Sequence, residues 1–173
     1  MAAQLRRPPR DLLEVAHRCP CGNPDVVATA PRLSDGTPFP TLFYLTCPRA
    51  VADIGSLEAS GLMRDLTERL QSDPRLASSY RAAHRAYLAS RSSYGDVPEV
   101  DGISAGGMPD RVKCLHALVA HALAAGPGVN PIGDAALELL APWWVPEPCV
   151  AAGHLTSGDP LPAERGPARE ADT

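Results

Sequence analysis

The chain has few aromatic residues, almost no lysine and no long apolar run. Aromatic side chains make up 5% of its 173 residues, so any core must consist mainly of aliphatic side chains and alanine. No stretch approaches the ~18 consecutive apolar residues of a membrane span, and we expect no membrane segment. No charged-then-apolar segment opens the chain, so we predict no secretory signal and expect a cytoplasmic protein.

The chain also lacks the basic charge that nucleic-acid binders use. Its formal net charge is −4, so we expect no nucleic-acid partner. Lys113 is the one lysine, and the arginines are spread along the chain apart from a group within residues 6–10. Neither a P-loop nor a G-x-G-x-x-G pattern is present. The sequence therefore names neither a reaction nor a substrate, and it leaves open whether the protein is an enzyme.

The patterns that are present mix a β-hairpin with helices. Residues 25–32 and 41–46 are rich in β-formers, and Asp35-Gly36 between them is a turn signal, which predicts a hairpin with a long loop. Helices are predicted at residues 11–18, 48–61, 62–72, 73–94, 109–125 and 134–140. We therefore expect an α+β fold in which a small β-hairpin sheet, extended at most by a third short strand, packs on about five helices.

Residues 109–125 form the most unusual of these helical patterns. After Lys113 the segment has no charged residue, and alanines lie opposite its leucine and valine side. A helix without a charged face is typically packed on several sides, so we expect this helix to be central and buried. Residues 1–10 are predicted to be a loose arm and residues 11–150 a single domain. Residues 151–173, rich in Gly, Pro, Ser and charge, are predicted to be a disordered tail.

Five cysteines in a chain without a secretory signal do not predict a disulfide framework. Closing the hairpin places Asp25 near Cys47, and Cys21 is a reach of at most ~13 Å from Asp25. Cys19 and Cys47 are therefore expected to gather at the open end of the hairpin, with Cys21 as a further candidate and Cys114 presented by the central helix. Thiolates favour zinc or an iron–sulfur cluster, so these sulfurs predict a thiol-rich metal site. Inert packing thiols and a redox or nucleophilic cysteine remain as alternatives.

Two further groups lie near the start of the central helix. On a regular helix Cys114 and His116 are ~200° apart, which argues against a His–Cys ligand pair and leaves His116 as a secondary ligand candidate. Gly107 precedes the predicted helix, and Arg111 and Lys113 lie in its first turns. Helix N-termini attract anions, so these three residues predict a site for a phosphorylated ligand. A plain loop-to-helix junction is the alternative.

Several short blocks occur together along the chain: Arg18-Cys19-Pro20, residues 35–42 (DGTPFPTL), 45–48 (LTCP), 112–116 (VKCLH) and 130–133 (NPIG). In this order they resemble the uncharacterised bacterial domain of unknown function 501 family, over roughly residues 4–150. The resemblance implies a small intracellular protein without an assigned activity or catalytic residues. Genes of this family often lie near those of a septum-formation initiator protein and an exopolyphosphatase-like enzyme. The resemblance therefore offers an alternative to a thiol site, a non-enzymatic protein with a partner in the cell-division or envelope machinery.

Overall fold

The structure, a computed structural model, describes residues 1–150. Three strands form an antiparallel sheet in the order β1-β2-β3: β1 (Leu12–Arg18), β2 (Pro24–Thr29) and β3 (Phe43–Leu45). The helices of this part of the chain are α1 (Ala2–Leu5), α2 (Pro48–Ala59), α3 (Leu62–Ser72), α4 (Pro74–Ser92), α5 (Leu115–Ala125) and α6 (Pro131–Glu138), with a 3₁₀ turn at Pro98–Val100. This arrangement is the α+β fold that the sequence predicts.

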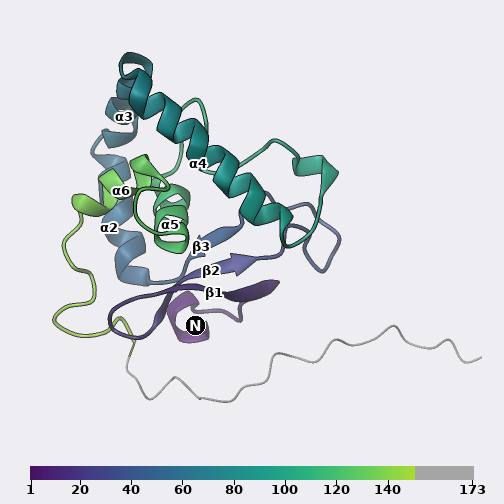
Figure 1. Cartoon of the computed structure of the whole chain (residues 1–173). Helices are drawn as coiled ribbons and strands as arrows, with labels where there is room; N and C mark the ends of the chain where they lie inside the picture. The colour runs from purple at the N-terminus through teal and green to yellow at the C-terminus, as the bar shows by residue number, and fades with distance from the viewer. Residues whose placement is uncertain (151–173) are drawn as a thin grey trace, which may run out of the picture.

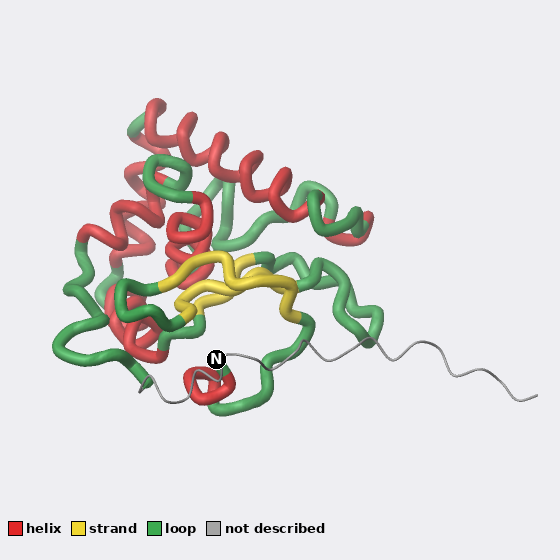
Figure 2. The backbone as a smooth tube through the Cα atoms, turned by 60° about the horizontal axis from the view of Figure 1, so that its bottom comes forward, coloured by secondary structure: helices red, strands yellow, loops and turns green. Residues whose placement is uncertain are grey.

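Helix α5 occupies the centre of the molecule. Figure 1 shows it between the sheet and helices α2, α4 and α6, and it packs directly against β3, α2 and α6. The residues from Leu118 to Ala122 are all buried, which explains why the helix needs no charged face. Figure 2 shows that α1 lies on the other side of the sheet from α5.

Strand β2 is the middle strand, and all six of its residues are buried. It pairs with β3 through Val26↔Leu45 and Val27↔Tyr44, so the predicted hairpin is present. The Thr29 amide donates to the Leu42 carbonyl at 2.8 Å and closes the long connection beyond the strands. Coverage on both faces explains why Val26, Val27 and Ala28 follow one another without polar alternation.

The prediction of a helix over residues 11–18 is wrong, because this segment is strand β1. It pairs antiparallel with β2, with Leu12 opposite Thr29 and Val15 opposite Val27. A short apolar run fits a helix or a strand equally well by periodicity. Here the neighbouring strand decides, because β2 supplies the backbone hydrogen-bond partners. The sheet therefore has three strands.

The predicted helix over residues 109–125 begins later, at Leu115. The preceding loop bonds to itself: the Arg111 amide donates to the Gly107 carbonyl and the Lys113 amide donates to the Gly106 carbonyl. Gly106 has a φ of 69°, and a Cβ there would lie 2.5 Å from a methyl group of Leu118. Only glycine allows the loop to lie this close to α5.

The start of α6 and the N-terminal arm also differ from expectation. Helix α6 begins at Pro131 rather than after Asp134, because the Asn130 side chain accepts the Gly133 amide and caps it. The predicted loose arm contains α1, whose buried Gln4 donates to the Pro24 carbonyl at 2.7 Å. The predicted disordered tail, residues 151–173, lies outside the described residues.

Candidate functional site

Three side chains that ligate metals in proteins meet at the start of α5. One ligand atom from each of Glu58, Cys114 and His116 lies within 4.8 Å of the other two. Glu58 is in the last turn of α2, Cys114 immediately precedes α5, and His116 is the second residue of that helix. All three side chains are partly exposed, so an ion in solution has access to them.

Cys114 reaches His116 because its backbone is not helical. It has φ −153° and ψ 113°, which is an extended conformation. The ~200° separation expected on a helix therefore does not apply, and the prediction that the two side chains face apart is wrong. The error follows directly from extending the helix back to residue 109.

Glu58 links the end of α2 to the beginning of α5. Its Oε1 accepts the Leu115 amide at 2.7 Å and lies 3.1 Å from His116 Nδ1. Burial acts to raise the pKa of Glu58, but the hydrogen bonds from His116 and the Leu115 amide outweigh it and lower that pKa. The carboxylate is therefore ionised near neutral pH and caps α5 from another helix.

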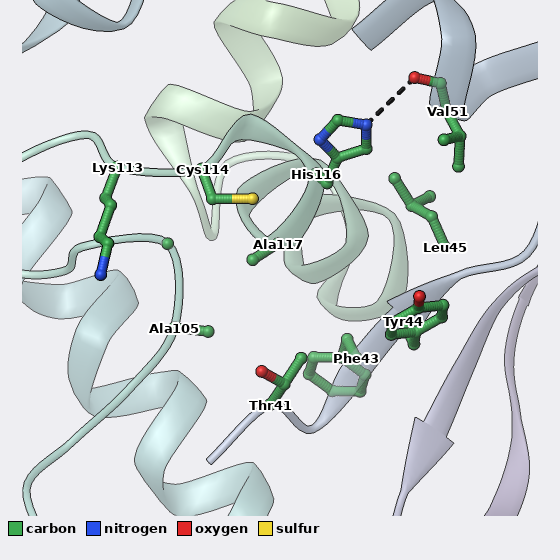
Figure 3. Close-up of a pocket in the computed structure, with 11 residues that line it drawn as sticks. Thr41, Phe43, Tyr44, Leu45, Val51, Ala105, Lys113, Cys114, His116 and Ala117 are labelled. Carbon is green, nitrogen blue, oxygen red and sulfur yellow. Dashed lines mark hydrogen bonds between the residues drawn. The ribbon is translucent and has the colours of Figure 1, made fainter. Parts of the chain in front are cut away.

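His116 uses its two ring nitrogens differently. Nε2 lies 3.1 Å from the Val51 carbonyl, as the dashed line in Figure 3 shows, while Nδ1 is the nitrogen beside Glu58. The contact with Cys114 raises the pKa of His116 to about 9, against the effect of burial and with help from Val51 and Glu58. The ring is therefore protonated at neutral pH and donates from both nitrogens.

A cavity of about 420 Å³ adjoins these side chains. In Figure 3 Cys114 and His116 lie on one side of it, with Phe43 and Tyr44 of β3 opposite. The walls are mainly apolar, and Lys113 adds a positive charge. The full lining is Thr41, Phe43, Tyr44, Leu45, Val51, Ala105, Gly106, Lys113, Cys114, His116 and Ala117. The size is that of a small-molecule site.

Cys19 and Cys47 lie elsewhere, in a buried cluster with Ala50 and Trp143. Cys47 immediately precedes α2, whereas Glu58 lies in the last turn of that helix, ~16 Å further along it. The structure thus brings Cys19 and Cys47 together, as the hairpin argument predicts, but places Cys114 in a different site.

Two more cysteines, Cys21 and Cys149, pack against the same buried cluster. Burial raises the pKa of Cys19 to about 12 and that of Cys47 to about 11. Both buried sulfurs are therefore neutral thiols at physiological pH unless a cation binds them. We refer to Cys19, Cys21, Cys47 and Cys149 as the four-cysteine cluster.

The predicted anion-binding residues lie in the loop before α5, not in its first turn. The Arg111 and Lys113 amides donate to carbonyls of the same loop, and Glu58 takes the first amide of the helix. Gly107, Arg111 and Lys113 do line a second cavity of about 680 Å³. An anion site there stays a prediction.

Sequence reasoning did not select Glu58 or Cys149. Glu58 belongs to no motif and is distant from Cys114 in the chain. Its position was a usable signal, because an acidic residue in the last turn of a helix opposes the helix dipole unless something binds it. Cys149 follows the last helix within a segment without periodicity, so no pattern placed it near Cys47.

Comparison with known proteins gives a family but no activity. The profile of a family described as "Protein of unknown function (DUF501)" matches residues 15–138. No curated protein and no solved structure matches the chain. No helix within residues 1–150 is long and apolar enough to cross a membrane. The expected cytoplasmic location, the absence of a nucleic-acid partner and the partner in division machinery stay predictions.

Proposed function

The chain belongs to the DUF501 family, whose description assigns no function, and we propose from its geometry that Glu58, Cys114 and His116 bind one divalent transition-metal ion, zinc in the first place. The ion's open coordination position would face the adjoining cavity. A single thiolate combined with imidazole and carboxylate suits zinc. It does not suit an iron–sulfur cluster, which needs more sulfur ligands.

The orientation of His116 is the observation that carries the proposal. A metal-bound histidine usually donates its second N–H to a carbonyl or carboxylate, which fixes the ring and the tautomer. Here Nε2 lies 3.1 Å from the Val51 carbonyl and leaves Nδ1 on the side of Glu58 and Cys114. Tetrahedral zinc ligands are ~3.5 Å apart, so small side-chain rotations bring the three atoms around one ion.

The same orientation argues against a Cys–His–Glu catalytic triad. In a triad the histidine faces the nucleophile with one nitrogen and the acid with the other. In this site the carboxylate lies against Nδ1, and the other nitrogen is engaged by a backbone carbonyl. The acid therefore does not orient the ring for proton transfer from the sulfur, and the ligand arrangement is the better description.

Three protein ligands would leave a zinc ion one open coordination position. At that position the ion would act as a Lewis acid or hold a water molecule that ionises near neutral pH. The chain's own residues define what reaches that position. Phe43, Leu45 and Val51 give the cavity apolar walls, and Lys113 would attract an anionic group. We therefore favour a metal-dependent reaction, and hydrolysis above other reactions. Its substrate would be a small and largely apolar molecule that carries a polar or anionic group.

Nitrogen NMR of the histidine rings tests the site directly. Zinc added to chelator-treated protein should shift the Nδ1 resonance of His116 and leave Nε2 protonated. His84 on α4, which pairs with Ser104 at 2.9 Å, serves as the histidine that should not respond. The variants Cys114→Ser and Glu58→Gln should weaken this response at least ~10-fold, whereas His84→Gln should not.

Two results would refute the proposal. One is a His116 ring that does not respond to zinc, or that responds through Nε2. The other is faster alkylation of Cys114 in the metal-free wild type than in His116→Gln, with zinc binding the same in both. The second result would assign a nucleophilic thiol instead.

A further inference from the structure

We propose that the four-cysteine cluster is a second metal site, in which Cys19, Cys21, Cys47 and Cys149 hold one zinc ion as thiolates. It is independent of the ion proposed at Glu58, Cys114 and His116, and its role is structural. Four thiolates around zinc form a closed site with no position for a substrate.

The fold collects these sulfurs from three separate parts of the chain. Cys19 and Cys21 lie in the turn between β1 and β2, and Cys47 lies between β3 and α2. The pairing of β2 with β3 continues past the strands, because the Thr46 amide donates to the Asp25 carbonyl at 2.9 Å. This pairing sets the turn beside the start of α2. The segment after α6 then crosses the same place and brings Cys149.

The sulfurs are arranged as two contacting pairs. Cys19 contacts Cys21, and Cys47 contacts Cys149, within one apolar cluster that Trp143 helps to bury. No three of these sulfurs lie within 4.8 Å of one another, whereas sulfurs around zinc are ~3.8 Å apart. An ion would therefore draw the two pairs together. The segment that carries Cys149 can follow, because it contains neither helix nor strand.

Buried N–H donors lie at one side of this cluster, next to Cys149. The side-chain amides of Gln4 and Asn23, each at least 95% buried, donate to the Pro24 and Val150 carbonyls at 2.7 and 3.2 Å and also point at the Cys149 sulfur at 3.5 and 3.9 Å. The buried Trp143 indole N–H has no acceptor within residues 1–150. A neutral thiol is a weak acceptor, and burying donors against it is costly. Thiolates are strong acceptors, and N–H groups directed at sulfur are a common outer shell of metal–thiolate sites.

Apolar packing alone accounts poorly for this arrangement. A buried cysteine often serves as a small hydrophobe. That role explains Cys19 and Cys47, which are 3% and 1% exposed. It does not explain why two buried amides are directed at the Cys149 sulfur, or why the Trp143 indole N–H of the same cluster has no acceptor among the described residues. Binding converts four thiols and one Zn²⁺ into a tetrathiolate complex of net charge −2 and releases four protons to solvent. The two amides directed at Cys149 offset part of that charge.

Counting zinc per chain by native mass spectrometry, on full-length protein purified without oxygen, tests the proposal. We expect two ions in the wild type and one in Cys149→Ser or Cys21→Ser. Both cysteines are partly exposed, so these variants should keep the fold, as circular dichroism would show. Cobalt substitution gives a second readout, since the tetrathiolate spectrum should persist in Cys114→Ser and vanish in Cys149→Ser.

The two proposals fail separately. Cys114→Ser removes the ion at α5 and leaves the four-cysteine cluster loaded, and Cys149→Ser does the reverse. A folded Cys149→Ser or Cys21→Ser protein with wild-type zinc content would overturn the second site. So would a metal-free cluster whose four thiols are free, or one whose cysteines form disulfides within the two pairs.

Discussion

The two histidines of α5 are five residues apart, yet their surroundings shift their pKa values in opposite directions. His116 lies at the partly exposed start of the helix, where contact with Cys114 and hydrogen bonds to Val51 and Glu58 raise its pKa to about 9. His121 is fully buried in the middle of the helix, and burial lowers its pKa to about 4. One ring is held as a cation and the other as a neutral aromatic.

The neighbours of His121 explain the difference. The Phe43 ring stacks on it at 5.8 Å, and the Tyr87 ring meets it edge-on at 5.1 Å. Asn130 Nδ2 lies 3.2 Å from its Nδ1, so the amide N–H donates to this nitrogen and the neutral ring is favoured over the cation. His121 thus packs like an aromatic core residue. The side chains that we propose as metal ligands thus lie where this helix begins, whereas its packed middle belongs to the core.

The largest expected effect is acid destabilisation through His121. Its folded pKa of about 4 lies below the ordinary value of 6.5, so the stabilisation is complete above pH 6.5 and is lost as the pH falls toward 4. The expected loss is about 3 kcal/mol. Urea unfolding at pH 7 and pH 3.5 measures it, with NMR titration of the ring. A His121 ring that titrates near 6.5 would remove the contrast with His116.

Gly133→Ala should produce the next largest effect. A Cβ there would lie 2.3 Å from the Leu118 carbonyl oxygen and 2.7 Å from the Ala122 Cβ, so α6 must move away from α5. We expect a loss of about 2 kcal/mol in denaturant unfolding. Because water then approaches the middle of α5, the pKa of His121 should rise toward 6.5 in the same variant. An unchanged stability would show that this side of α5 is loosely packed.

His116 should make the protein less stable as the pH rises, whereas His121 does so as the pH falls, and its effect should be smaller. The measurement uses chelator-treated protein. The folded pKa of His116, about 9, exceeds 6.5, so the stabilisation is complete below pH 6.5 and is lost as the pH rises through 9. Solvent screening at this partly exposed site reduces it to about 1 kcal/mol. Glu58→Gln should lower the His116 pKa and flatten this part of the pH profile. If the profile of that variant equals that of the wild type, Glu58 is not the partner.

Gly55→Ala should have the smallest effect and should stabilise the protein. Gly55 lies inside α2, the helix that supplies Glu58, and no atom lies within 4 Å of the position of a Cβ there. Alanine in a helix is favoured over glycine by about 0.5–1 kcal/mol. The same unfolding measurement on Gly55→Ala and Gly133→Ala therefore compares a helix position with room for a methyl group against one without such room. Destabilisation by Gly55→Ala would contradict this.

Local pattern was sufficient for the elements whose signals are local. The hairpin of β2 and β3, the helices α2 to α4 and the central position of α5 follow from turn residues, proline starts and the missing charge after Lys113. Strand β1 did not follow, because its apolar run is too short to separate a helix from a strand. The start of α5 did not follow either, since the loop before it is held by contacts with Gly106 and Gly107 that no periodicity reveals.

The candidate site was predictable only in part. Hairpin closure is enough to bring Cys19 near Cys47, because antiparallel pairing fixes which residues are opposite. The approach of Glu58 to Cys114 depends on how α2 packs against α5, and that packing is not encoded near either residue. The approach of Cys114 to His116 depends on the extended backbone of Cys114 itself. An error of six residues in a helix start was enough to separate them.

The Oε1 atom of Glu58 makes two contacts, and both matter when the protein binds a ligand. The same Oε1 accepts the first amide of α5 and lies beside His116, so anything that attracts this carboxylate also loosens the beginning of that helix. The first turn of α5 forms one wall of the cavity. We therefore predict that ligand binding in the cavity and metal binding to the Glu58 carboxylate are coupled, in which case each changes the affinity for the other by an equal factor.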